Sequence, residues 1–155
     1  MMFIQFVVSL FATLSFAVLF SAPKVELVFC GITGALGWIV YLACLGANTG
    51  KPIANLIAAL TLTLVARFFS AARKKPATIY LLCGIFPLVP GAGIYYTSYY
   101  FIMNQMDLCG QAGMDTVKVA GAIVLGILFG FALPQSWFNA CLLYTSPSPR
   151  DPKTS

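Results

Sequence analysis

The residues in this sequence that are best suited to chemistry are two prolines and a glycine in the run Pro87-Leu88-Val89-Pro90-Gly91, which interrupts an apolar stretch over residues 78–103. Each proline removes a backbone N–H donor and clashes with a carbonyl one turn earlier, while Gly91 is free to adopt positive φ. The pattern therefore predicts a broken helix. In a bilayer such a break is tolerated only where other helices bury it or where it lines a polar cavity.

A broken helix can bind a small charged molecule through its backbone alone. Amide N–H groups at the start of one half-helix attract a carboxylate, and carbonyl groups at the end of the other attract a cation. The candidate binding residues are Pro87 and Pro90, which break the helix, Gly91 and Gly93, which allow close backbone approach, and Tyr95 and Thr97, which offer polar contacts. The competing interpretation is a proline kink that serves only packing.

The composition is that of an integral membrane protein. Of the 155 residues, 60% are hydrophobic and only 8% are charged, and the mean hydropathy is +0.91. A soluble domain has about 25% charged residues, so this chain lacks the polar surface that water requires. Residues 1–140 are expected to form a single all-α membrane domain, because the length allows four or five spans of about 20 residues each.

The end of the chain is interpreted separately. The run from Cys141 to Asp151 resembles the translation of a transposon-type sequencing adapter read through in frame. We therefore interpret residues 141–155 as a non-native, disordered tail and exclude them from fold reasoning. A short native disordered tail is the alternative.

Neither a metal site nor an enzyme active site is expected. The sequence has no histidine, and Cys30, Cys44, Cys83 and Cys109 show no paired spacing, so no metal or cofactor is predicted. Intramembrane enzymes need a nucleophile, a base or paired acids inside a span. The native acids all fall in predicted loops: Glu26, Asp107 and Asp115. Any titrating group for ion coupling is therefore expected in another chain.

Five hydrophobic segments can be recognised along the chain. They cover residues 2–20, 27–46, 53–70, 78–103 (the broken segment) and 116–133. The first is interpreted as a retained helix, with a secretory signal as the alternative. Glycines at 31, 34 and 37, and a stripe of Ala122, Gly126 and Gly130, predict faces for close helix packing. Asn55 is interpreted as hydrogen-bonded within the protein, with substrate contact as the alternative.

Basic residues predict the orientation in the membrane. One cluster follows the third segment: Arg67, Arg73, Lys74 and Lys75. The positive-inside rule places this loop in the cytoplasm, and alternation then places Lys24 on the same side and Lys51 outside. If the broken segment is re-entrant, the orientation of everything after it inverts. The cluster lies beside a membrane span, so no nucleic-acid binding is expected.

The break also carries a family resemblance. Lys75-Pro76-Ala77-Thr78, followed by the run from Gly84 to Gly91 and then by Tyr95, resembles the small-subunit type of the bacterial threonine/serine exporter family. The resemblance covers roughly residues 3–133. It implies one half of a transporter of the bacterial inner membrane, the other half being a separate chain or a fused domain. It also implies export of threonine, serine or a small dicarboxylate such as succinate.

The composition, the helix break and the family resemblance together predict a membrane subunit of a secondary exporter for threonine, serine or a small dicarboxylate such as succinate. Its expected partners are the lipid bilayer, a small-molecule substrate, and a larger subunit of the same family or further copies of itself. The alternative is a non-transporting membrane scaffold or assembly protein, whose small-residue faces only hold other helices.

Overall fold

The computed structural model describes residues 2–134, and these residues form helices and no strands. The elements in order are α1 (Met2–Leu19), the 3-10 helix η1 (Lys24–Glu26), α2 (Leu27–Gly46), α3 (Lys51–Arg73), α4 (Ala77–Ile85), the 3-10 helix η2 (Phe86–Leu88), α5 (Gly91–Ile102) and α6 (Met106–Ala132). The predicted all-α class is confirmed. The predictions for residues 141–155 lie outside the described residues.

The number of membrane spans also agrees with the sequence. Within residues 2–134, four helices are long and apolar enough to cross a membrane: α1, α2 with η1, α3 and α6. A fifth span is present if the helices on either side of the break are counted as one; they differ in direction by 50°. The chain therefore bends at the break.

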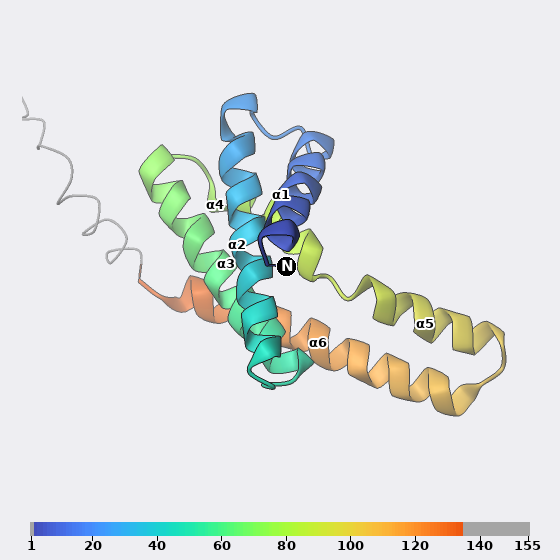
Figure 1. Ribbon diagram of the computed structural model, residues 1–155. Coiled ribbons are helices and arrows are strands. Elements are labelled where there is room, and N and C mark those ends of the chain that lie inside the picture. Colours follow the sequence, from blue (N-terminus) through green and yellow to red (C-terminus); the bar gives the residue numbers. More distant parts are fainter. Residues whose placement is uncertain (1, 135–155) are drawn as a thin grey trace, which may run out of the picture.

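Helix α3 lies between three other helices and packs against α2, α4 and α6 (Figure 1). It can do so because its contact residues are small: Ala54, Ala58, Ala59 and Ala66 are all fully buried. On α6, a Cβ added at Gly126 would lie 2.6 Å from the Leu56 carbonyl oxygen of α3. The stripe predicted as a packing face is thus used inside this chain, between α6 and α3.

The glycines of α2 allow equally close contacts on the other side of the bundle. Gly34 faces the Thr13 side chain of α1, and a Cβ added at Gly37 would lie 2.9 Å from the Leu62 side chain of α3. In lipid, helices associate through close packing, since burial of apolar surface gives little advantage there. The predicted glycine face therefore joins α2 to both α1 and α3.

The connection after the broken segment was predicted wrongly. Residues 104–115 were expected to form a polar loop, yet α6 begins at Met106, so Asp107 and Asp115 are helical. Packing against α5 explains the difference, because a Cβ at Gly113 would contact Thr97 at 3.4 Å. Helix α5 and the first half of α6 run side by side as a hairpin that extends away from the other helices, whereas the second half of α6 packs on α3 (Figure 1).

Glu26 was also expected in a loop, and this prediction is wrong. It ends η1 and is only 2% exposed, and one of its carboxylate oxygens lies 3.1 Å from the Nη2 atom of Arg73. A carboxylate can be buried in this way because a cation compensates its charge. The ion pair places the Lys24 turn and the basic end of α3 at the same end of the bundle, as the predicted topology requires.

Arg67, assigned above to the basic cluster, has a role in packing as well. Its side chain is buried, and its Nη1 atom donates hydrogen bonds to the carbonyl oxygens of Gly130 (2.6 Å) and Leu133 (2.7 Å). These carbonyls lie at the C-terminal end of α6, where a cation is favourable. Arg67 therefore fastens the end of α6 to α3.

The α3–α6 contact can be tested with two glycines of the same helix. Gly126→Ala should lower the stability by about 1–3 kcal/mol, the usual cost of overpacking, because the added Cβ meets backbone atoms of α3. Gly121→Ala is the matched control, since nothing lies within 4 Å of its added Cβ. Thermal unfolding in detergent measures both; equal melting temperatures for the two variants would contradict the packing described here.

Candidate functional site

The candidate site is the interruption between α4 and α5. The 3-10 helix η2 ends at Leu88, Val89 is extended (φ −60°, ψ 130°), and Pro90 has φ −77° and ψ 58°. These Pro90 angles are those of an inverse γ-turn, which the hydrogen bond from Gly91 N–H to the Val89 carbonyl closes at 2.7 Å. The helix is thus broken where the prolines predicted.

The two glycines after the break have different roles. The sequence predicted that Gly91 is free to take positive φ, but its φ is not positive, and a Cβ added there would meet nothing within 4 Å. Gly91 therefore leaves open space beside the break, and it is not needed to relieve backbone strain. Gly93 does allow close approach, because a Cβ added there would collide with the Thr116 hydroxyl of α6.

A cavity of about 470 Å³ opens beside the break. Its walls come from the second half of α2, the first turn of α3, the break with the start of α5, and the middle of α6. The lining residues are Trp38, Tyr41, Lys51, Asn55, Pro87, Leu88, Val89, Pro90, Gly91, Ala92, Gly93, Tyr96, Ala112, Asp115, Thr116 and Val119. Four of the six candidate binding residues, Pro87, Pro90, Gly91 and Gly93, therefore lie together at one cavity.

The other two candidates lie elsewhere. Tyr95 is 63% exposed and does not line the cavity, and the Thr97 hydroxyl donates a hydrogen bond to the Gly93 carbonyl at 2.7 Å. Tyr96 lines the cavity instead. Positions three apart share a helix face, so the spacing from Gly93 could have indicated Tyr96. A substrate contact by Tyr95 or Thr97 stays a prediction.

The first turn of α5 supplies backbone donors to the cavity. Gly91, Ala92 and Gly93 all line it and are the first three residues of the helix. The Gly91 N–H is used in the γ-turn with Val89, so the donors that remain are those of Ala92 and Gly93. N–H groups in the first turn of a helix have no carbonyl partner one turn earlier, and they carry the positive end of the helix dipole. This edge of the cavity therefore suits an anionic group such as a carboxylate.

Two side chains of opposite charge also line the cavity, and the sequence analysis assigned neither to the site. Lys51 is the first residue of α3, and Asp115 lies on α6 with its carboxylate 3.4 Å from the Lys118 ammonium group. Both were assigned to connections between spans. Only the packing of α3 and α6 around the break brings them to one cavity.

Asn55 lies one helical turn after Lys51 on α3. It is 4% exposed, and its side-chain Nδ2 donates a hydrogen bond to the Lys51 carbonyl at 2.8 Å. The structural role favoured by the sequence is confirmed by this bond, and the residue also lines the cavity. Within residues 2–134, no group of three His, Cys, Asp or Glu residues could hold a metal ion.

Comparisons with known proteins match the sequence to one family. The model of the family described as "Threonine/Serine exporter, ThrE" matches residues 5–132. A relative from Mycobacterium tuberculosis (strain ATCC 25618 / H37Rv), named "Probable threonine/serine exporter", is 25% identical over 114 residues. The match covers 74% of this chain but only 21% of that relative. No solved structure matches the chain significantly.

The family match contains the whole break and every residue that lines the cavity. It also contains most of each helix that is able to cross a membrane. The chain therefore belongs to the threonine/serine exporter family and is a multi-pass protein of the bacterial inner membrane.

Proposed function

We propose that this chain is a membrane subunit of a secondary transporter that exports small polar amino acids such as threonine and serine. The observation that supports this most directly is the cavity at the helix break, which combines backbone donors with a cation and an anion. Sites of this type, at discontinuous helices, bind substrates in several transporter folds. A volume of about 470 Å³ is ample for one amino acid with water around it.

The charges of the cavity favour an amino acid over a dicarboxylate. The first-turn N–H groups of α5 and the Lys51 ammonium group can attract the carboxylate of a substrate. Asp115 can attract its ammonium group and would repel a second carboxylate. Within the range implied by the family resemblance, threonine and serine fit this charge pattern better than succinate.

A larger subunit of the same family is proposed to complete the pathway. The match covers only 21% of that relative, so most of the relative lies outside the match. Helix α5, which forms one wall of the cavity, has no buried residue. A second chain against α5 would close that wall.

Efflux from bacteria tests the proposal. Cells loaded with labelled threonine, serine or succinate should export threonine and serine when this chain and a larger family subunit are both produced. Membrane levels of both proteins serve as the control. Absence of export of all three compounds, with both proteins in the membrane, would contradict the proposal and favour the scaffold interpretation.

The cavity itself is tested at Gly91. Gly91→Leu should abolish export while the protein remains in the membrane, because Gly91 lines the cavity and a Cβ added there meets no atom within 4 Å. Gly91→Ala is the control and should retain export, since its added Cβ meets no atom within 4 Å. Normal export by Gly91→Leu would remove the cavity from the transport pathway.

The charge selectivity is tested on two acids of α6. Asp115→Asn should weaken threonine export about tenfold, the usual effect of losing an interaction with a charged group, and should not weaken export of succinate. Asp107→Asn changes an acid of the same helix that does not line the cavity, and it should leave the rates unchanged. Equal effects of both variants on threonine export would show that Asp115 has no special role.

A further inference from the structure

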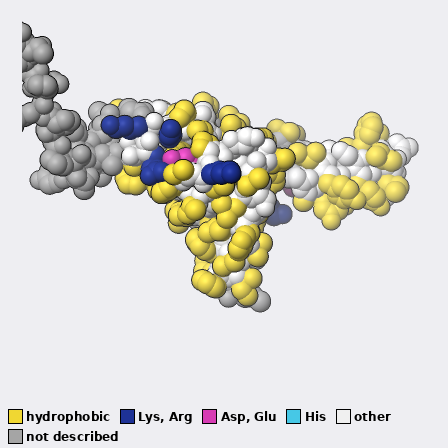
Figure 2. Space-filling view, turned by 90° about the horizontal axis from the view of Figure 1, so that it is seen from above, with side chains coloured by type: hydrophobic (Ala, Val, Ile, Leu, Met, Phe, Trp, Pro, Cys, Tyr) yellow, Lys and Arg dark blue, Asp and Glu magenta, His cyan; other side chains and the backbone are white. Residues whose placement is uncertain are grey.

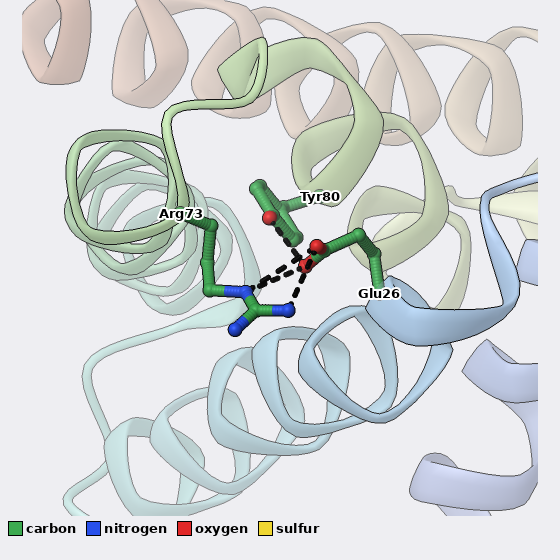
Figure 3. A network of polar contacts seen from close by, with 3 residues as sticks. All are labelled: Glu26, Arg73 and Tyr80. Carbon is green, nitrogen blue, oxygen red and sulfur yellow. Dashed lines mark hydrogen bonds and ion pairs between the residues drawn. The ribbon is translucent and has the colours of Figure 1, made fainter.

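Three side chains from separate elements meet at the basic end of the bundle. Arg73 approaches Glu26 with both Nε (3.3 Å) and Nη2 (3.1 Å), and the Tyr80 hydroxyl donates a hydrogen bond to Glu26 Oε2 at 2.7 Å (Figure 3). The Arg73 guanidinium also lies 4.8 Å from the centre of the Phe29 ring. These contacts leave Glu26 only 2% exposed and Tyr80 fully buried.

The three side chains connect three helices at their ends. Glu26 directly precedes α2, Arg73 is the last residue of α3, and Tyr80 lies in the first turns of α4. A carboxylate at a helix start and a guanidinium at a helix end are each favoured by the helix dipoles. The contacts therefore hold the ends of α2, α3 and α4 together.

This network and the cavity lie at opposite ends of α3. Lys51 lines the cavity and begins the helix, whereas Arg73 ends it. A 23-residue helix is about 35 Å long, comparable to the thickness of a bilayer. The basic residues around Glu26 predict that this end of the bundle faces the cytoplasm. Figure 2 shows this end, with Lys and Arg side chains gathered around an acidic group.

Directly beneath the network, the bundle is closed. Cys30 follows Glu26 by one helical turn on α2 and is fully buried, and Cys83 follows Tyr80 by three residues on α4 and is 1% exposed. The Arg73 side chain keeps 35% of its surface in contact with solvent. Arg73 is thus open to water on one side, whereas the Glu26 side chain is only 3% exposed, so separation of the pair must also bring water to Glu26.

We propose that the contacts among Glu26, Arg73 and Tyr80 form a cytoplasmic gate. They close the cytoplasmic end while the cavity is open towards the other end, and they separate to let substrate enter from the cytoplasm. This inference rests on the proposed export function, because alternating access requires that a transporter close one end while the other is open. Cys30 and Cys83 become accessible from the cytoplasm when the gate opens.

Thiol labelling measures the opening without any transport. The full chain, with its other cysteines replaced by serine, is produced in inverted membrane vesicles and treated with a membrane-impermeant maleimide. Arg73→Gln and Glu26→Gln should each raise the labelling rate of Cys30 and Cys83 about tenfold, because removing one partner of a charged hydrogen bond shifts a two-state equilibrium by about that factor. Tyr80→Phe, which removes only one hydrogen bond, should give a smaller increase.

The matched control is Lys118→Gln, which removes the exposed ion pair with Asp115 and should leave labelling unchanged. Exchanging the charges, with Glu26→Arg and Arg73→Glu in one chain, should bring labelling back towards the original rate. Unchanged labelling in both Arg73→Gln and Glu26→Gln would overturn the gate. Labelling that rises equally in right-side-out vesicles would also overturn the gate, because it would report unfolding. The same holds if labelling rises only in variants that no longer give a single peak in size-exclusion chromatography.

The two proposals fail in different ways. If the gate is wrong but the chain exports amino acids, efflux is normal while labelling does not respond to Arg73→Gln. If the export proposal is wrong, efflux of threonine and serine is absent, whereas one-sided labelling still responds to the gate variants.

Discussion

The structure depends on how closely α3 approaches its neighbours. Between helices in lipid, burial of apolar surface gives little driving force, so association depends on van der Waals contact and on hydrogen bonds across the interface. Ala58 and Ala59 on α3 and Gly126 on α6 bring the two backbones into direct contact, and Arg67 adds hydrogen bonds to the end of α6. Because α3 is held along its whole length, it fixes the positions of the groups at both of its ends.

The break between α4 and α5 is possible only within this packing. Backbone N–H and C=O groups without hydrogen-bond partners are costly in hydrocarbon. Here a 3-10 turn and an inverse γ-turn around Pro90 pair some of these groups with one another. The start of α5 faces a cavity whose other walls come from α2, α3 and α6. The same interruption that a soluble protein would place in a loop becomes a polar surface inside a membrane protein. Gly91 keeps that surface open because it carries no side chain.

Only 8% of the residues are charged, so the position of each charged side chain is informative. Lys51 and Asp115 line the cavity at one end of α3, and Glu26 pairs with Arg73 at the other. Between them lies an apolar core that includes Leu62. The charged side chains at the two ends of α3 are thus separated by the apolar core of the bundle.

The sequence by itself determined those features that depend on local chemistry. Few charges indicate a membrane protein, two prolines inside a helical segment interrupt it, and small residues at helical spacing mark packing faces; all of these hold in the structure. The tertiary structure decided which side chains meet. Glu26 and Arg73 are 47 residues apart, and nothing in their local spacing predicts their contact. The packing of α3 and α6 around the break likewise decided that Lys51 and Asp115 line one cavity. Contacts of this kind follow from how separate helices are rotated and positioned against one another, which the pattern within each helix does not specify.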